Sequence, residues 1–435
     1  MDLALQTGLI LLAVFPILLL IGIPISISIG ITSVVSILTA LPLENALITS
    51  AQRIFSGIDS FSLLAIPFFV LAGVIMNNGG IALRLVNFAK LMGGKLPGSL
   101  AQTNVVGNML FGSVSGSAVA AAAAIGGTIG PLQEKEGYDK EFSAAVNIAS
   151  APTGLLIPPS NSLIIYSLVS GGTSVAALFM AGYIPGILWG LAVMGVALVI
   201  SKRKKYGQTQ KISFKDAFKV FVEAIPSLSL IIIIIGGIVG GVFTATEGAA
   251  VAVAYSFILA FFFYKTIKLK DMPKLLMETV EMTGIIVFLI GVSSIMSWVL
   301  AFTNIPNAIT TVLLKISSNP IIILIIMNII LLIVGTFMDL TPAILIFTPI
   351  FLPVVKNFGM DPIHFGMILI FNLCIGGITP PVGNTLFVGC RVAKTKLEHV
   401  IKHLLPFYAA IIAVLMLITF VPEISLFIPR LLGMI

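Results

Sequence analysis

The chain consists of long apolar segments that alternate with short polar stretches. Most of these segments are close to the roughly 20 residues that an α-helix needs to cross a bilayer. The pattern predicts an all-α polytopic membrane protein with about ten crossings. Seven of them are placed at residues 4–20, 23–41, 61–78, 141–171, 174–200, 226–243 and 246–264.

Two apolar segments are not interpreted as simple crossings. The chain is assigned to the cytoplasmic face before and after the first, and the second is the counterpart of the first in the sequence repeat described below. The first, at about 98–131, has apolar arms around the small polar tip GSVSGSAVAAAA. The second, at about 320–356, carries GTFMDLTP at its tip. We expect each of them to form a re-entrant helical hairpin, with its tip enclosed by protein.

Two crossings are interrupted by a proline pair. The first interruption reads LLIPPSNSLIIY, Leu155 to Tyr166, and the second reads GITPPVGNTLFV, Gly377 to Val388. Proline removes a backbone donor and disfavours helix at the residue before it, so nearby carbonyl groups lose their helical partners. Such breaks are tolerated only inside protein or beside a water-filled cavity. The pattern predicts broken helices at about 141–171 and 363–391.

The second half of the chain repeats the first. Proline, glycine and aspartate residues, which set backbone conformation, recur 222 residues later (353 − 131, for example). The repeats are predicted at 1–200 and 220–435, joined by a linker at 201–219. Because each copy has about five crossings, the copies have opposite orientations, as in many secondary transporters. The matched positions are Pro131, Gly137, Asp139, Pro158 and Pro159 with Pro353, Gly359, Asp361, Pro380 and Pro381.

Composition and charge agree with this topology. The chain is 58% hydrophobic and 9% charged, whereas a soluble chain carries about 25% charged residues. Lysine and arginine gather in the linker at 201–219 and in a loop at 264–274, which are therefore cytoplasmic. Residues 1–52 contain neither, which places the N-terminus outside. The net charge of +7 thus reflects membrane topology and indicates no nucleic-acid partner.

The sequence does not indicate an enzyme. It contains no phosphate-binding P-loop pattern, and its three histidines, His364, His399 and His403, are scattered. Cys374 and Cys390 lack the spacing of metal ligands and are expected to be core residues. Transport powered by ATP would therefore need another subunit.

Neutral oxygen atoms are predicted to gather where the proline pairs and the hairpin tips meet. Carbonyl groups of unwound helix commonly coordinate Na⁺ in transporters, so we predict one Na⁺ site per repeat and no other metal or cofactor. The alternative is that the proline pairs are structural kinks, with serine and asparagine as helix caps. The first site would draw on Ser113, Ser115, Ser150, Thr153, Pro158, Asn161 and Ser162, and the second on Gly335, Thr336, Asp339, Thr379, Gly383, Asn384 and Thr385.

Further polar residues at the tips and breaks are candidates for substrate contact, namely Ser117, Ser160 and Thr341. Packing of small residues between helices is the alternative explanation for the serines of the first tip. Asp339 is a carboxylate in an apolar segment and therefore a functional candidate. It could ligate an ion, cap the second arm of its hairpin or face water.

Five stretches of the chain together resemble one family. They are GSVSGSAVAAAAAIG, PTGLLIPPSNSLIIY, TATEGAAVAVAY, GTFMDLTPAI and GGITPPVGNTLFV. In combination they resemble the large membrane subunit, the DctM-like subunit, of tripartite ATP-independent periplasmic (TRAP) transporters. The resemblance covers essentially the whole chain.

The resemblance implies a Na⁺-coupled importer of an organic acid anion, such as sialic acid or a C4-dicarboxylate, in the bacterial inner membrane. It implies two partners, a small membrane subunit and a periplasmic substrate-binding protein. It also implies an ion-transporter-type fold with an elevator motion. The mobile domain would comprise residues 98–172 and 320–391, the other spans would form the scaffold, and surface segments near 81–95 and 303–316 would join the two.

Two other functions remain open at this stage. A standalone Na⁺-coupled dicarboxylate or anion carrier would use the same architecture without a binding protein. A channel could also be built from two re-entrant hairpins, although a channel does not need interrupted spans that meet tips from both sides of the membrane.

Overall fold

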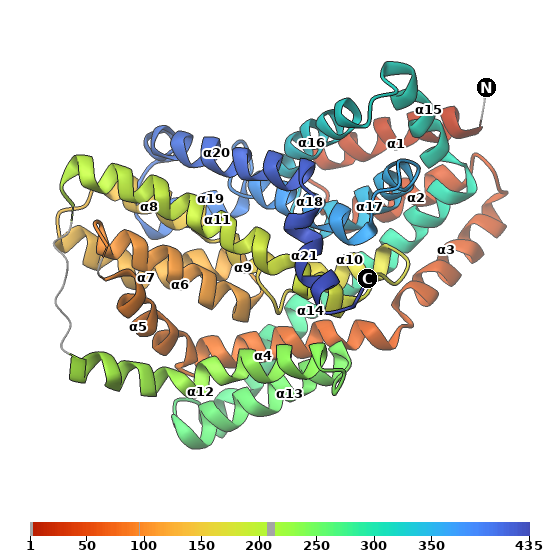
Figure 1. Cartoon of the computed structure of the whole chain (residues 1–435). Helices are drawn as coiled ribbons and strands as arrows, with labels where there is room; N and C mark the ends of the chain where they lie inside the picture. Colours follow the sequence, from red (N-terminus) through yellow and green to blue (C-terminus); the bar gives the residue numbers. More distant parts are fainter. Residues whose placement is uncertain (1–2, 95, 207–213) are drawn as a thin grey trace.

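A computed structural model describes residues 3–94, 96–206 and 214–435 as helices joined by short turns (Figure 1). Every regular element in these ranges is helical. Among the described residues, eight helices are long and apolar enough to cross a membrane, judged by length and composition. The prediction of an all-α polytopic membrane protein is confirmed.

The first helices are α1 (Leu3–Leu20), α2 (Ile25–Ile37) and α4 (Ala65–Asn78), the last preceded by a 3₁₀ turn at Phe61–Leu64. Between them lies α3 (Leu43–Ile58), which the apolar pattern did not predict. Its sequence mixes polar residues with apolar ones that remain exposed, such as Leu47 and Phe55. A search for continuous apolar runs therefore misses it.

The first hairpin consists of α6 (Ser99–Ser115) and α7 (Ala118–Lys135). It ends four residues later than expected, because Pro131 lies inside α7 and polar residues complete the last turn. The broken helix that follows consists of α8 (Lys140–Ser150), the single turn α9 (Thr153–Leu156) and α10 (Asn161–Val169).

The second hairpin consists of α16 (Pro320–Phe337) and α17 (Leu340–Lys356), which are the predicted bounds. Its broken helix consists of α18 (Pro362–Gly376) and α19 (Asn384–Val392). Both proline pairs, Pro158-Pro159 and Pro380-Pro381, have cis peptide bonds. The two interruptions therefore share the cis bond as well as the proline pair.

The remaining spans are long helices. They are α11 (Val175–Lys204), α12 (Phe214–Val239), α13 (Ala245–Ile258, continued by a π-helix at Leu259–Phe263), α14 (Met272–Phe302) and α20 (Leu397–Phe420). Short helices α5 (Ile81–Gly93) and α15 (Ile305–Ile316) occupy the predicted surface segments, and α21 (Glu423–Leu431) ends the chain. Residues 207–213 of the basic linker lie outside the described residues.

The helices pack as two groups. The first, here called the frame, contains α1 to α4 and α12 to α14, which pack mainly on one another. The second, here called the hairpin body, contains both hairpins, both broken helices, α11 and α20. The short helix α5 packs on α6 of the body and α12 of the frame, and α15 packs on α17 and α14.

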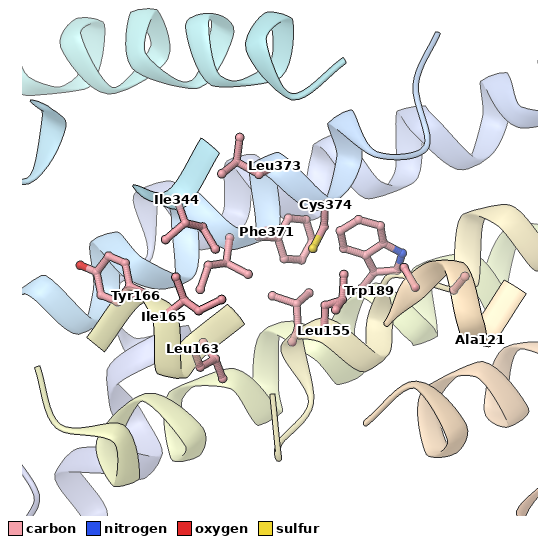
Figure 2. Packing of buried hydrophobic residues seen from close by; sticks show 14 of the residues in the cluster. Ala121, Leu155, Leu163, Ile165, Tyr166, Trp189, Ile344, Phe371, Leu373 and Cys374 are labelled. Carbon is pink, nitrogen blue, oxygen red and sulfur yellow. The ribbon is translucent and has the colours of Figure 1, made fainter. Parts of the chain in front are cut away.

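The packing of α11 and α20 differs from the partition that the family resemblance implied. Trp189 of α11 donates a hydrogen bond to the Ala149 carbonyl of α8 over 2.7 Å, and its ring lies 4.6 Å from that of Phe371 in α18. Figure 2 shows this contact. Phe407 of α20 meets Phe142 of α8 at 6.5 Å between ring centroids. Both helices therefore belong with the hairpins by contact, although their long apolar sequences resemble those of the frame.

Candidate functional site

A cavity of about 440 Å³ lies where the two hairpin tips meet the two broken helices. Ser115–Ala120 from the first tip and Asp339–Pro342 from the second line it. Asn161 and Ser162 line it from the first break, and Asn384 and Thr385 from the second. Segments that are far apart in the sequence, and that correspond between the repeats, therefore share one site.

Five helices begin at this cavity, namely α2 of the frame, whose first residue is Ile25, and four helices of the hairpin body. The first residues of α7, α10, α17 and α19 are Ala118, Asn161, Leu340 and Asn384, and all four line the cavity. A helix N-terminus presents unpaired backbone N–H groups and the positive end of the helix dipole. The cavity is therefore suited to an anion although its wall carries no basic side chain among the described residues.

The first tip reverses direction at Gly116, whose φ of +62° places it in the left-handed region that favours glycine. Ser117 then caps α7, because its hydroxyl accepts a hydrogen bond from the Ala120 N–H over 3.2 Å. The Asn161 side chain lies close by, since a Cβ added to Gly116 would be 3.0 Å from its Nδ2 atom. The first tip and the first break thus meet at the cavity wall.

The second tip meets its break through hydrogen bonds. Asn384 Nδ2 donates to Asp339 Oδ1 over 3.3 Å, and the Val382 N–H donates to the Thr336 carbonyl over 3.2 Å. Asp339 occupies the N-cap position of α17, but its side chain makes no capping hydrogen bond. Of the three alternatives for Asp339, the capping role is therefore wrong, and the carboxylate lies at the cavity, where it is exposed.

Behind the tips, backbone packs directly on backbone in both repeats. A Cβ added to Gly154 would lie 2.1 Å from the carbonyl carbon of Gly112, and one added to Gly376 would lie 2.3 Å from that of Gly335. Gly154 and Gly376 are related by the 222-residue offset (376 − 154). Glycine is required because any side chain would separate the hairpin from its broken helix.

The structure divides the predicted ion and substrate residues into two sets. Eight line the cavity, namely Ser115, Ser117, Asn161, Ser162, Asp339, Thr341, Asn384 and Thr385. The others do not line it, namely Ser113, Ser150, Thr153, Pro158, Ser160, Gly335, Thr336, Thr379 and Gly383.

Several hydroxyls in the second set donate to nearby backbone carbonyls. Ser160 donates to Leu155 over 2.5 Å, which places this substrate candidate behind the wall instead of in the cavity. Ser113 donates to Leu110 over 2.9 Å, and Thr336 donates to Ile333 over 2.7 Å. Thr153 and Thr379 donate in the same way to Ser150 and Ile375. Donation leaves the oxygen lone pairs available to a cation.

Ser150 belongs to a buried polar network that the sequence analysis did not identify. Asn108 of α6 donates to Ser150 Oγ over 2.8 Å and to Asn147 Oδ1 of α8 over 3.1 Å. Asn147 in turn donates to the Ala122 carbonyl of α7 over 2.8 Å. The network joins both hairpin arms to the broken helix. In the sequence, the feature that could have revealed it is the presence of asparagine residues within apolar segments.

The second repeat has a similar arrangement. Asn372 of α18 donates to Asn328 Oδ1 of α16 over 2.7 Å, and Asn328 donates to Thr419 Oγ1 of α20 over 3.2 Å. In both repeats, an asparagine of the first hairpin arm thus bonds an asparagine of the broken helix. The hairpins are therefore held in place by hydrogen bonds as well as by packing.

The frame supplies a third wall that the sequence analysis also missed. Ser26 of α2, Asn77 of α4 and Glu278 of α14 line the cavity. The sequence feature that could have indicated this wall is Glu278, a carboxylate near the start of a long apolar helix. Within the described ranges, no three His, Cys, Asp or Glu side chains gather in a group that could hold a metal ion.

The chain was compared with known proteins. The family model for the tripartite ATP-independent periplasmic transporter, DctM component, matches residues 12–424. YgiK of Salmonella typhimurium is 53% identical, over 97% of this chain and 97% of the relative. The C4-dicarboxylate TRAP transporter large permease protein DctM of Rhodobacter capsulatus is 36% identical, over 99% and 100% of the two chains. The sialic acid TRAP transporter large permease protein SiaM of Vibrio cholerae is 38% identical, over 88% and 89%.

A solved structure has a similar fold. The crystal structure of the YdaH transporter of Alcanivorax borkumensis superposes with a TM-score of 0.60 over 87% of this chain and 88% of that one. The two sequences are 12% identical, so the likeness concerns the fold alone.

Proposed function

The chain belongs to the DctM-component family of tripartite ATP-independent periplasmic transporters, as its motifs predicted, and we propose that it is the large permease of a Na⁺-coupled importer of an organic acid anion. The observation that carries this proposal is the cavity at which four helices of the hairpin body begin. It combines helix N-termini for an anion with clustered hydroxyl and amide oxygens for a cation.

The proposed substrate class follows from the cavity and from the relatives. Two relatives are named for C4-dicarboxylate and for sialic acid, and both of these are organic acids. Ser117 and Thr341 lie at the first turns of α7 and α17, where a bound carboxylate would meet backbone N–H groups. A sialic-acid-type sugar acid is our preferred substrate within this class.

Two Na⁺ ions would bind between the tips and the breaks, one in each repeat. Asn161 and Ser162 would ligate the first ion. The ligands of the second would be Asp339, Asn384 and Thr385. Carbonyl groups that the proline pairs leave unpaired would complete both sites. The charge of the ions would strengthen anion binding at the helix N-termini. Coupling arises because the solute-loaded state would bind Na⁺ more tightly than the empty state.

The proposed motion is an elevator-type displacement of the hairpin body relative to the frame. Two features support it. The cavity is lined by both groups of helices, so a relative displacement would change its exposure. The short helices α5 and α15 pack on both groups and could act as connecting arms. The chain would operate in the bacterial inner membrane with a small membrane subunit and a periplasmic substrate-binding protein.

Reconstitution tests the tripartite arrangement. Purified chain and small subunit are placed in proteoliposomes, and uptake of sialic acid and of succinate is measured under an inward Na⁺ gradient. We expect uptake only when the matching binding protein is added outside. Uptake at the same rate without the binding protein would instead identify a standalone Na⁺-coupled carrier.

Replacement of the two break asparagines tests the ion sites. Asn161→Ala and Asn384→Ala each remove an oxygen from one proposed site, so we expect the Na⁺ concentration for half-maximal uptake to rise about tenfold, or about 1.4 kcal/mol. Asn307→Ala is the matched control, since Asn307 is an exposed residue of α15 outside the cavity. If both break variants keep the Na⁺ dependence of the control, the proposal of two sites is wrong.

A further inference from the structure

The polar residues of the frame wall lie near helix ends. Ser26 is the second residue of α2, Asn77 lies one residue before the end of α4, and Glu278 lies in the second turn of α14. In the predicted topology these helix ends are cytoplasmic, because the N-terminus is outside and the basic 264–274 loop precedes α14. In this topology the polar end of the frame wall faces the cytoplasm, and we infer that the cavity opens toward that side.

The mouth of the cavity carries negative charge. Glu278 and Asp339 are the charged side chains that line the cavity within the described residues, and both are carboxylates. Asp339 belongs to the second tip, whereas Glu278 belongs to the frame and is half-buried at the mouth. No salt bridge among the described residues involves Glu278. Its charge therefore acts on whatever ions pass the mouth.

We propose that Glu278 is a selectivity residue that makes the cytoplasmic mouth favourable to cations and unfavourable to anions. A unit charge about 7 Å away in water changes the local concentration of a monovalent ion roughly threefold. Released anions would therefore re-enter less readily, while Na⁺ would exchange freely. The statement about released anions rests on the proposed function. The effect of the Glu278 charge and the direction of opening do not depend on it.

The inference leads to a labelling experiment that needs no knowledge of the substrate. The full chain carries Cys374→Ala and Cys390→Ala, and Ser26→Cys supplies a single thiol at the mouth. Membrane-impermeant methanethiosulfonate reagents, one with a trimethylammonium group and one with a sulfonate group, are applied to inside-out and to right-side-out vesicles. The measured quantity is the ratio of the two labelling rates. Monodisperse elution of each purified variant confirms that it is folded.

We expect labelling from the cytoplasmic side, with the cationic reagent reacting faster. Glu278→Gln should lower the cation-to-anion rate ratio about three- to sevenfold at low salt, and 1 M salt should remove most of this difference. Glu281→Gln is the matched control, because Glu281 lies on the same helix, is exposed and does not line the cavity. It should leave the ratio unchanged.

Two outcomes would overturn the inference. Labelling of Ser26→Cys only from the outer side would show that the cavity does not open toward the cytoplasm. An equal rate ratio in Glu278→Gln and Glu281→Gln would show that Glu278 is an ordinary solvated charge. Either outcome leaves the proposed transport function intact, because that function is tested by uptake and not by labelling.

Discussion

At the scale of single residues, equivalent positions in the two repeats have different roles. Asp361 Oδ1 accepts a hydrogen bond from the Ile363 N–H over 2.7 Å and so caps α18. Asp139 is at the corresponding position before α8, but its side chain makes no capping bond. It instead forms a salt bridge with Lys204 at the end of α11. Sequence symmetry therefore does not ensure equal chemistry at each site.

The pairing of Asp139 predicts a pH-dependent contribution to stability. The hydrogen bond from Lys204, followed by that from Tyr206, lowers the pKa of the Asp139 carboxyl. A depressed folded-state pKa stabilises the folded protein above the unfolded value of about 3.9, and this contribution is lost as the pH falls through the folded value. We expect Asp139→Asn to destabilise the protein at pH 7 by less than about 1 kcal/mol, since the pair is exposed to solvent.

Thermal unfolding of the purified protein in detergent measures this effect. The difference in Tm between the original protein and Asp139→Asn should be present at pH 7 and should shrink below pH 4. Asp216→Asn changes an exposed aspartate in α12 and serves as the control. A pH-independent difference for Asp139→Asn would rule out the charge as its cause.

At the scale of elements, each hairpin and its broken helix form one unit in which backbone packs on backbone. The contact between Gly112 and Gly154 recurs between Gly335 and Gly376. Asparagine hydrogen bonds join the same hairpin arms to the same broken helices. These contacts position the tips against the interrupted segments, so the proposed ion sites depend on them.

Addition of one methyl group to either contact should separate the tip from its break. For Gly154→Ala and Gly376→Ala we expect a loss of about 1–3 kcal/mol in stability and a larger proportional loss of uptake. Tm and uptake are measured together on the same preparations. Gly127→Ala in α7 is the control, since an added Cβ there would have no atom within 4 Å. Normal uptake in both contact variants would show that the tips do not require this close approach.

At the scale of the whole molecule, the two repeats should face opposite sides of the membrane. The α7–α8 turn and the start of α12 lie at the left of Figure 1, and the N-terminus and α15 lie at the right. Lys135 at the end of the first hairpin and Asn357 just after the second are exposed and differ by 222 residues (357 − 135). An inverted repeat places them on opposite faces.

Single-cysteine labelling in intact cells tests this topology. In a background that lacks Cys374 and Cys390, an impermeant thiol reagent added outside should label Asn357→Cys and should leave Lys135→Cys unlabelled. Permeabilisation should expose Lys135→Cys to the same reagent. Labelling of both positions from one side would contradict the inverted arrangement of the hairpins.

The sequence by itself determined most of the helical elements, the interruptions and the correspondence of the halves. Those features depend on local chemistry: apolar runs match the bilayer thickness, proline removes donors, and repeated proline and glycine preserve backbone conformation. The second hairpin, expected at 320–356, corresponds to α16 and α17. The candidates Asn161, Asp339 and Asn384 line one cavity, and their role as ion ligands stays a prediction.

Only the tertiary structure decided which of these residues share a cavity and what forms its third wall. Ser150 and Ser160 were plausible by spacing, but neither lines the cavity, and their hydroxyls donate to backbone carbonyls. Glu278 joins the cavity from α14, and α11 packs on the hairpin body although its apolar sequence resembles that of a frame helix. Such contacts between distant segments depend on the shape and packing of whole helices, which no local pattern of residues specifies.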